Sequence, residues 1–171
     1  METIAKPQNS RSDGRALRQA LGKFATGVAI VTTRDGEERD YGMTINSFTS
    51  VSLAPPLVLW SVSRSAPSYP VFTTTENFVI SVLGEEQENI SNRFAGSVAD
   101  KFAGVRCGRS SMGPLFIDGA LAVFECSVHE RYEGGDHLIL VGQVENYSCV
   151  NGRALVFHDG WYGTLQKAGA Q

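Results

Sequence analysis

The stretch GMTINSFTSVSLAPPLVLW, residues 42–60, places many hydroxyl and amide side chains inside a segment that otherwise has the composition of a β-strand. The polar side chains are Thr44, Asn46, Ser47, Thr49, Ser50 and Ser52, and the apolar ones include Met43, Ile45, Phe48, Val51 and Leu53. A buried polar group without a hydrogen-bond partner costs on the order of 1–3 kcal/mol. Two interpretations satisfy this constraint: an edge strand with its polar side in water, or a strand that offers its polar groups to a ligand.

The segment before this stretch predicts a β-hairpin. VAIVTT, residues 28–33, has the β-branched composition of a strand, and RDGEER, residues 34–39, contains the Asp-Gly pair of a tight turn. We therefore expect residues 40–53 to return as one strand beside residues 28–33.

The rest of the chain predicts more strands than helices. Further strands are expected at residues 55–63, 77–83, 121–130, 136–149 and 154–165. An amphipathic helix is expected at residues 12–27, and short helices at 65–72, 85–96 and 97–104. Helices inserted between strands, rather than alternating with them, favour a mainly β fold with short helices: a closed or partly closed antiparallel barrel.

The composition is that of an ordinary globular protein of 171 residues, with 42% hydrophobic residues, 19% charged residues and a net charge of −3. We expect one domain at residues 12–165, with polar tails at 1–11 and 166–171. The slight acidity argues against a nucleic-acid partner, and no apolar run reaches the roughly 18 residues that cross a membrane. The amino terminus lacks the apolar core of a signal peptide, and the three cysteines are widely spaced, so a cytoplasmic protein with reduced thiols is expected.

The common catalytic and nucleotide-binding motifs are missing from the sequence. No GxGxxG follows a strand, and neither GxxxxGK[ST] nor GxSxG occurs. His129, His137 and His158 stand at no metal-ligand spacing, and the chain contains no HExxH and no paired CxxC. No metal is therefore expected, and conventional sets of acid, base and nucleophile are poorly signalled.

Serine and arginine residues gather at two of the expected helices. SVSRSAPSYP, residues 61–70, places Ser63, Arg64, Ser65 and Ser68 at a helix start, where free backbone N–H groups favour an anion. ISNRFAG, residues 90–96, supplies Arg93, which is either a bidentate phosphate donor or an ordinary solvated helix arginine.

The segment YEGGDHLILVGQV, residues 132–144, places two glycines, Asp136 and His137 directly before an apolar strand. Glycine supplies the positive φ of a tight turn and aspartate caps such turns. The alternative is a loop whose backbone and imidazole approach a ligand closely. On local sequence the tight turn is favoured, because such dipeptides are common in turns.

Taken in order, these segments resemble the short-chain flavin reductase family, the reductase components of two-component flavin-dependent monooxygenases. The matching segments are ALGKFATGVAIVTT, GMTINSFTSVSLAPPLVLWSV, SAPSYP, ENISNRFAG, DKFAGV, GPLFIDGALAVFEC and GGDHLILVGQV. Each is weak alone, whereas the ordered set is specific and spans about residues 15–165. The resemblance implies an FMN-binding split β-barrel that forms a homodimer. It also implies transfer of a hydride from NADH, or NADPH, to FMN or FAD, with the reduced flavin supplied to a separate monooxygenase.

The same resemblance implies roles for individual residues. The strand that borders the isoalloxazine contains Gly42, Met43, Thr44, Ile45, Asn46, Ser47, Phe48 and Ser50. The residues near the ribityl and phosphate groups are Ser63, Ser65, Ser68, Arg93 and Phe94. Asp136 and His137 belong to a loop that approaches the pyridine nucleotide, with His137 as the catalytic residue beside the nicotinamide, and Tyr162 helps to bind NADH. Because flavin and nicotinamide carry the reactive atoms, a conspicuous acid–base set is not required.

The sequence leaves several alternatives open. It does not decide between FMN and FAD, between NADH and NADPH, or which oxygenase receives the flavin. A flavodoxin-like electron carrier would keep its FMN and lack an NADH site. A pyridoxamine-phosphate oxidase relative, a reductase of ferric or corrinoid acceptors, or a non-catalytic flavin- or haem-binding module would share the expected fold.

Overall fold

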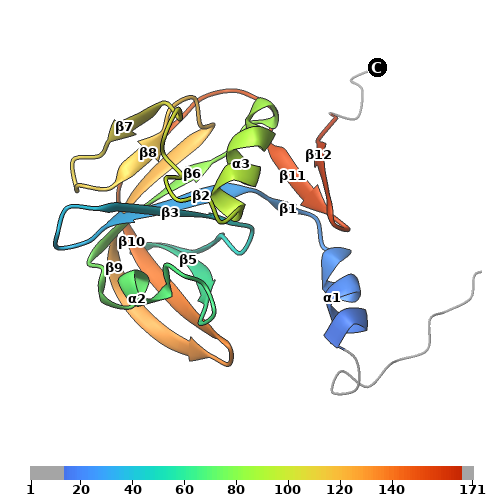
Figure 1. Cartoon of the computed structure of the whole chain (residues 1–171), viewed down its shortest axis with the longest axis horizontal. Coiled ribbons are helices and arrows are strands. Elements are labelled where there is room, and N and C mark those ends of the chain that lie inside the picture. The colour runs from blue at the N-terminus through green and yellow to red at the C-terminus, as the bar shows by residue number, and fades with distance from the viewer. Residues whose placement is uncertain (1–13, 167–171) are drawn as a thin grey trace, which may run out of the picture.

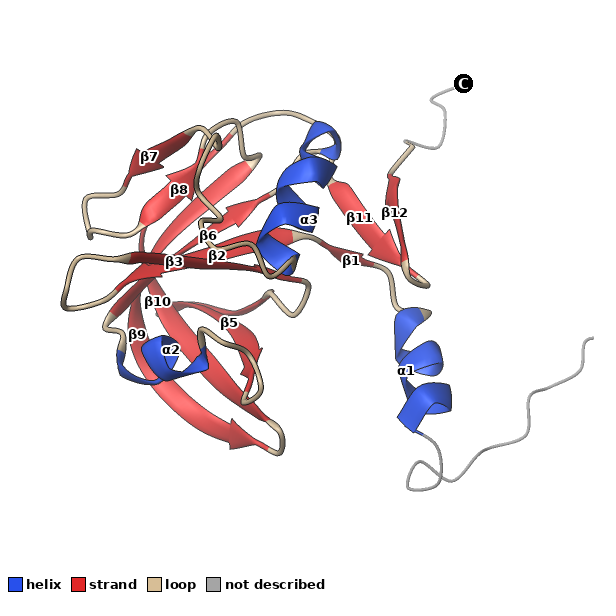
Figure 2. Ribbon diagram, in the orientation of Figure 1, coloured by secondary structure: helices blue, strands red, loops and turns tan. Residues whose placement is uncertain are grey.

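The computed structural model describes residues 14–166, which form three antiparallel sheets (Figure 1). The strands are β1 (Thr26–Gly27), β2 (Ala29–Arg34), β3 (Asp40–Ile45), β4 (Thr49–Leu53), β5 (Pro56–Ser63), β6 (Asn77–Val82), β7 (Cys107–Arg109), β8 (Leu115–Ile117), β9 (Ala122–Gly134), β10 (His137–Cys149), β11 (Leu155–His158) and β12 (Trp161–Thr164). The helices are α1 (Gly14–Gly22), α2 (Tyr69–Thr74) and α3 (Glu88–Ala95), the last preceded by a 3-10 turn, Glu85–Gln87. The predicted mainly β fold with short helices is confirmed (Figure 2).

The two edge strands of the large sheet are consecutive in the chain. This seven-stranded sheet has the order β3-β2-β6-β9-β10-β5-β4. Asn46, Ser47 and Phe48 connect β3 at one edge to β4 at the other, which requires the sheet to curl strongly. Within the described residues β3 and β4 are not paired, so the curled sheet is open. Ser47 continues the pairing of β4 with β5, because its Oγ accepts a hydrogen bond of 3.0 Å from the backbone N–H of Ser61 on β5.

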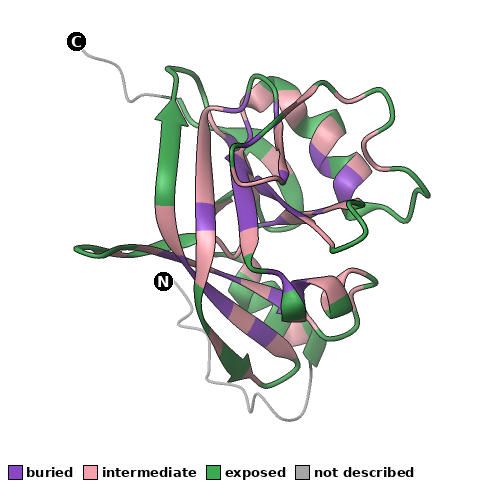
Figure 3. Ribbon diagram, turned by 90° about the vertical axis from the view of Figure 1, so that its left-hand side faces the viewer, coloured by how far each residue is buried: buried purple, intermediate pink, exposed green. Residues whose placement is uncertain are grey.

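Two apolar clusters lie on opposite faces of β2. The inner cluster is centred on Trp60, Phe72, Phe78, Cys126 and Leu140, and the outer cluster on Ile30, Leu83, Phe94, Ile117 and Leu155. Ala29 and Val31 belong to the inner cluster, whereas Val28 and Ile30 belong to the outer one. Since successive strand side chains point to opposite faces, the run VAIV is apolar because both faces are covered. Figure 3 shows the buried residues in the middle of the molecule and the exposed ones at the ends of the strands.

Three predictions of local structure are wrong, those for residues 40–53, 97–104 and 154–165. The last of these segments forms a hairpin of two strands, β11 and β12, because the chain turns at Asp159 and Gly160. Residues 40–53 form two strands, β3 and β4, because the chain leaves one edge of the sheet and joins the other. Residues 97–104 form bends and turns instead of a helix. There the Asp100 carboxylate accepts hydrogen bonds from the backbone N–H groups of Phe102 (3.0 Å) and Ala103 (3.1 Å), and such local bonds compete with a helix. The predicted hairpin of β2 and β3 is confirmed.

The predicted amino-terminal helix is present as α1, and none of its residues is buried in the part of the chain that the structure describes. The exposed apolar side chains of this region are Leu17, Leu21 and Phe24. Asp159, in the turn between β11 and β12, holds the end of α1: its N–H donates to the carbonyl of Gly22 (2.8 Å), and its carboxylate pairs with Lys23 (2.5 Å). Figure 1 shows α1 beside β1, β11 and β12 and away from the large sheet.

The predicted start of the domain, residue 12, falls outside the described part of the chain, whereas its predicted end, residue 165, is one residue before the last described one. Residues 1–13, which include the expected tail and helix cap, and residues 167–171 are not among the described residues. The domain boundaries at 12 and 165 therefore stay predictions. Among residues 14–166, no helix has the length and apolar character needed to cross a membrane, and no group of three or more His, Cys, Asp or Glu side chains is arranged to hold a metal.

Candidate functional site

Several predicted site residues line one cavity of about 600 Å³ beside β3, which we call the β3 cavity. Its walls come from β3, the segment before α2, the end of α3 and the loop that follows α3. The predicted residues among its lining are Gly42, Met43, Thr44, Ser68 and Phe94. Lys101 and Phe102 also line it, although the sequence analysis assigned them no role. The volume is typical of cavities that bind small molecules.

β3 offers backbone groups to this cavity because it is an edge strand. It pairs with β2 on one side, from Asp40 opposite Arg34 to Ile45 opposite Ala29, and no other strand of the described residues pairs with its second side. An edge strand leaves a row of N–H and C=O groups free for another partner. Such a row can bind the polar edge of a planar ligand.

Gly42 is the most crowded position in the cavity wall. A Cβ at this position would lie 2.6 Å from Cε1 of Phe94 and 3.1 Å from Cζ of Phe102. These two rings meet edge to face, with their centroids 5.0 Å apart, and Phe94 is fully buried. The glycine is therefore needed for the close approach of the β3 backbone to the ring pair.

Thr44 and Tyr162 are linked through Ser91 of α3. Thr44 Oγ1 donates to the carbonyl of Ser91 (2.6 Å), and the Ser91 hydroxyl shares a hydrogen bond of 2.7 Å with the Tyr162 hydroxyl. The ring of Tyr162 packs against Phe157 with a centroid distance of 5.4 Å. Tyr162 is thus a packing residue behind α3 that reaches the cavity wall through Ser91, and it does not line the cavity.

Arg93 holds the loop that follows α3. Its Nε donates to the carbonyl of Lys101, and its Nη2 donates to the carbonyl of Asp100, each at 2.7 Å. Arg93 lies outside the lining of the β3 cavity. Arg93 lines a separate cavity of about 520 Å³, together with Arg106 and Asp118. Its expected role as a phosphate donor stays a prediction.

The predicted anion cluster and the predicted glycine turn lie side by side. His137, the first residue of β10, is opposite Ser63, the last residue of β5. The backbone N–H of Arg64 donates to the carbonyl of Asp136 (2.9 Å) and so joins the two segments. The loop then runs on to Ser68, which lines the β3 cavity. Two stretches far apart in sequence therefore form one continuous surface beside this cavity.

Arg64, which the sequence placed with the serines at the expected anion-binding helix start, joins these two segments. Its side chain donates to the carbonyl of Gly135 (3.3 Å) and forms an ion pair with Glu133. The hydroxyls of Ser63 and Ser65, on either side of Arg64, bond to each other at 2.8 Å.

His137 is partly exposed at a tight turn. Gly135 has a φ of +70°, so the turn predicted from the glycines is present. The His137 side chain is 41% exposed, and its Nδ1 lies 2.7 Å from Oδ1 of Asp136. This hydrogen bond lowers the pKa of Asp136 below its ordinary value. The tight turn also leaves the imidazole accessible, so the two interpretations of this segment are compatible.

The remaining predicted residues of the 42–50 stretch lie elsewhere. Ile45 is buried in the inner cluster, and Phe48 packs on it with its ring 5.5 Å from that of Phe124. Asn46 and Ser50 are exposed, and Ser50 lies on β4 at the opposite edge of the sheet. Within one chain, the stretch borders the β3 cavity up to Thr44, because the backbone leaves that edge after Ile45.

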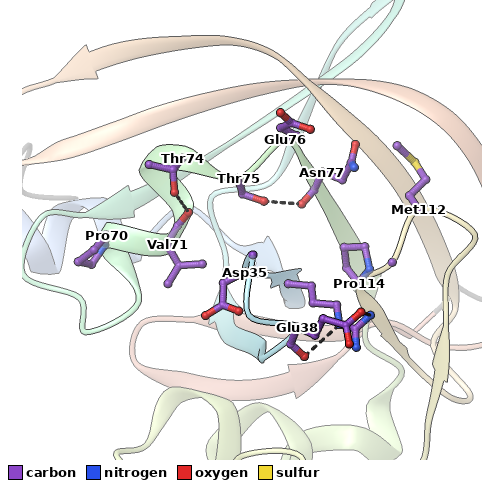
Figure 4. Close-up of a pocket in the computed structure, with 13 residues that line it drawn as sticks. Asp35, Glu38, Pro70, Val71, Thr74, Thr75, Glu76, Asn77, Met112 and Pro114 are labelled. Atoms are coloured by element: carbon purple, nitrogen blue, oxygen red, sulfur yellow. Dashed lines mark hydrogen bonds and ion pairs between the residues drawn. The ribbon is translucent and has the colours of Figure 1, made fainter.

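A second cavity, of about 590 Å³, contains none of the predicted site residues (Figure 4). It lies between the β2–β3 turn, the end of α2 and the loop before β8. Its acidic lining residues are Asp35, Glu38 and Glu76. As Figure 4 shows, threonines of this wall bond to backbone carbonyls: Thr74 to Val71 (3.3 Å) and Thr75 to Asn77 (2.8 Å). We therefore place the candidate site at the β3 cavity.

Comparison with known families decides the family of the chain. The profile described as "Flavin reductase like domain" matches residues 21–166, which include every residue that lines the β3 cavity. The chain belongs to the flavin reductase-like domain family. The resemblance expected from the ordered motifs is thereby confirmed.

Known relatives of this flavin reductase-like chain differ in length. It is 46% identical to the actinorhodin polyketide dimerase of Streptomyces coelicolor, over 79% of this chain and 76% of the relative. It is 40% identical to the reductase component of the flavin-dependent trigonelline monooxygenase of Acinetobacter baylyi, over 90% of this chain and 50% of the relative. The chain thus spans about half to three quarters of these two relatives.

One solved structure matches almost the whole chain. It is the NADH:FAD oxidoreductase SgcE6 of Streptomyces globisporus C-1027 in complex with NAD and FAD fragments. The match has a TM-score of 0.90 and 36% identity, and it covers 98% of this chain and 100% of that chain.

Proposed function

We propose that this protein is an NAD(P)H-dependent flavin reductase that transfers a hydride from NADH or NADPH to FMN or FAD and supplies reduced flavin to a separate monooxygenase. The observation that carries this proposal is the β3 cavity, which gathers five of the predicted flavin-binding residues in a chain of the flavin reductase-like family. Two similar proteins support it: one relative is the reductase component of a monooxygenase, and one solved structure is a complex with NAD and FAD fragments.

The residues of the β3 cavity fit a flavin. An isoalloxazine needs apolar contacts for its faces, and Met43 and Phe102 supply them, with the buried ring of Phe94 packed against that of Phe102. Its polar edge needs donors and acceptors, and the unpaired side of β3 provides both. The close packing at Gly42 lets the strand backbone, instead of a side chain, face the ligand.

The chain's part in the reaction is to position two planar rings. When bound, flavin supplies the atom that accepts the hydride, and a dihydronicotinamide supplies the hydride. Such a transfer requires the reacting atoms to be held about 3–3.5 Å apart. In this proposal the N–H groups of β3 bind the polar edge of the flavin, where they stabilise negative charge. No side chain has to take up or release a proton on carbon.

We assign the nicotinamide to the surface beside His137. The Asp136 carboxylate engages Nδ1 of this imidazole, which leaves Nε2 for a ligand. Ser63 lies opposite His137 and Ser65 is bonded to Ser63, so both hydroxyls belong to the same surface. In this assignment Tyr162 supports α3 through its hydrogen bond to Ser91. The expected contact between Tyr162 and NADH would then be made by Tyr162 of a second copy of the chain.

A homodimer with a split barrel is part of this proposal. Large apolar side chains are exposed along α1, β4 and β12, at Leu17, Leu21, Phe24, Leu53, Trp161 and Leu165. Exposed apolar surfaces of this kind mark interaction sites, and a second copy would cover them. Sedimentation of a Leu21→Ser, Phe24→Ser variant should show a monomer, whereas an unchanged dimer would exclude α1 from the interface. We further propose that the protein works in the cytoplasm, where NADH is available.

Steady-state NADH and NADPH oxidation, each with FMN, with FAD and without flavin, tests the proposed function. A flavin reductase oxidises the nicotinamide when free flavin is present. A flavodoxin-like carrier would not oxidise it, and a reductase of ferric or corrinoid acceptors would respond to those acceptors without added flavin.

A further inference from the structure

Lys101 is the one Lys, Arg or His side chain among the residues that line the β3 cavity. Its Nζ donates to the carbonyl of Phe94 (2.7 Å) and lies 3.4 Å from the carbonyl of Gly42. The ammonium group therefore sits between the end of α3 and the edge strand β3. Both acceptors are neutral, so neither compensates its charge.

The acidic residues of the cavity are bound to other partners. Asp40 accepts two hydrogen bonds from the guanidinium of Arg109, at 3.0 and 2.8 Å. Asp100 accepts its hydrogen bonds from backbone N–H groups of its own loop. None of the ion pairs found among residues 14–166 includes Lys101. Burial lowers the pKa of Lys101, as expected for a cation that is partly removed from water without a counter-ion.

Arg93 holds the backbone that carries this lysine. Its two hydrogen bonds go to consecutive carbonyls, those of Asp100 and Lys101. These bonds restrict the loop at the residue whose side chain enters the cavity wall. The guanidinium is thereby used as a support, and the ammonium of Lys101 is the charge that the cavity presents.

We propose that Lys101 is the phosphate-binding residue of the β3 cavity and that Arg93 is its positioning residue. An ammonium group has three N–H donors, and two of them face the carbonyls of Phe94 and Gly42. The third is available to a phosphate oxygen, and the negative phosphate supplies the missing counter-charge. The inference rests on the proposed function, since the flavin and the pyridine dinucleotide both carry phosphate. Either one is a source of the same chemistry.

The test compares ligands with and without phosphate. FMN and riboflavin are titrated into the wild-type protein, Lys101→Met, Lys101→Arg and the control Arg106→Met, whose side chain is exposed on another surface. Lys101→Met should weaken FMN binding roughly 10- to 100-fold and leave riboflavin binding within about twofold. Lys101→Arg should keep most of the FMN affinity, and the control should keep all of it. The same proteins are assayed for the KM of NADH and of N-benzyl-1,4-dihydronicotinamide, a hydride donor without phosphate.

The outcomes separate the two sources of phosphate. Selective loss of FMN binding assigns the phosphate to the flavin, and a raised KM for NADH alone assigns it to the pyridine dinucleotide. Both results support the proposal. Equal losses for phosphate-bearing and phosphate-free ligands, together with a lower melting temperature, would show that Lys101 only fastens α3 to β3. Unchanged affinities for all four ligands would also overturn the proposal.

A second variant guards against misfolding. Lys101→Gln keeps a donor for the two carbonyls but removes the charge, so it replaces Lys101→Met if circular dichroism shows that the latter is unfolded. A wild-type protein that binds no flavin and oxidises no NADH would refute the proposed function itself. A wild-type protein that binds FMN, with variants that bind it equally well, would refute the role of Lys101 alone.

Discussion

The buried ring of Phe94 lies so close to the Cα of Gly42 that position 42 has no room for a Cβ. Gly42→Ala should therefore force Phe94 and Phe102 to shift, which costs about 1–3 kcal/mol of unfolding free energy. Because both rings line the β3 cavity, flavin affinity should fall as well. Urea unfolding and flavin titration measure the two effects. Gly36→Ala is the control, since a Cβ there meets nothing within 4 Å. Wild-type stability and affinity in Gly42→Ala would contradict the packing described for the cavity wall.

Arg93→Ala should lower stability and weaken flavin binding together. The variant removes two hydrogen bonds to the loop at Asp100 and Lys101, a loss of about 1–3 kcal/mol. FMN and riboflavin should both bind more weakly, and FMN by the larger factor, because the loop that loosens carries Lys101 as well as Phe102. Arg106→Ala, which removes an exposed ion pair with Asp118, should change stability by about 0–1 kcal/mol. Selective loss of FMN binding with an unchanged melting temperature would instead make Arg93 a direct phosphate ligand.

His137→Ala should impair the NADH half of the reaction. The side chain is 41% exposed, so its removal leaves no buried cavity and the melting temperature should stay the same. We expect a raised KM for NADH, or slower reduction at saturating flavin, with unchanged flavin affinity. Stopped-flow reduction measures this, and His129→Ala, an exposed histidine on β9, is the control. If reduction at every NADH concentration matches the wild type, His137 has no role in the nicotinamide site.

The turn between β2 and β3 should make stability depend on acid. Asp35 accepts hydrogen bonds from the backbone N–H groups of Arg39 and Glu37 and from the side chains of Arg39 and Tyr41. Led by the Arg39 N–H, these bonds lower the pKa of Asp35 to about 2, from an ordinary value of about 3.9.

A lowered carboxyl pKa stabilises the folded state above the unfolded pKa, and this contribution is lost as the pH falls from about 4 to about 2. The difference in unfolding free energy between wild type and Asp35→Asn should therefore be largest above pH 5 and shrink below pH 4. A difference that stays constant down to pH 2 would show that the carboxylate charge does not matter.

The strands were predictable because the pattern of apolar and polar side chains along a strand shows which faces of the sheet are covered. The run VAIV in β2 is apolar on both faces, and each face meets a different cluster. The break between β3 and β4 was not predictable, since alternation shows an extended chain and cannot show which edge of the sheet it joins. Likewise, the pattern of α1 indicates a helix but not that its apolar face points away from its own chain's core.

Site residues were predictable where the local sequence marks them. They were not predictable where their role depends on which segments the fold brings together. Thr44 stood out because several hydroxyl and amide side chains crowd into one strand, and Gly42 followed from the resemblance to flavin reductases. Lys101 gave no such signal, because a single lysine in a polar segment resembles any solvated one. Its role depends on the loop that brings it under α3, and that loop is held by Arg93, a residue that the sequence suggested as a ligand.

The most direct test of the central claim is anaerobic reduction of free flavin in large molar excess over the protein. With NADH as donor, the absorbance of oxidised FMN or FAD near 450 nm should bleach completely, because each protein molecule binds, reduces and releases many flavins. Bleaching that stops at one flavin per protein molecule, or that does not occur with either flavin and either nicotinamide, would contradict the account.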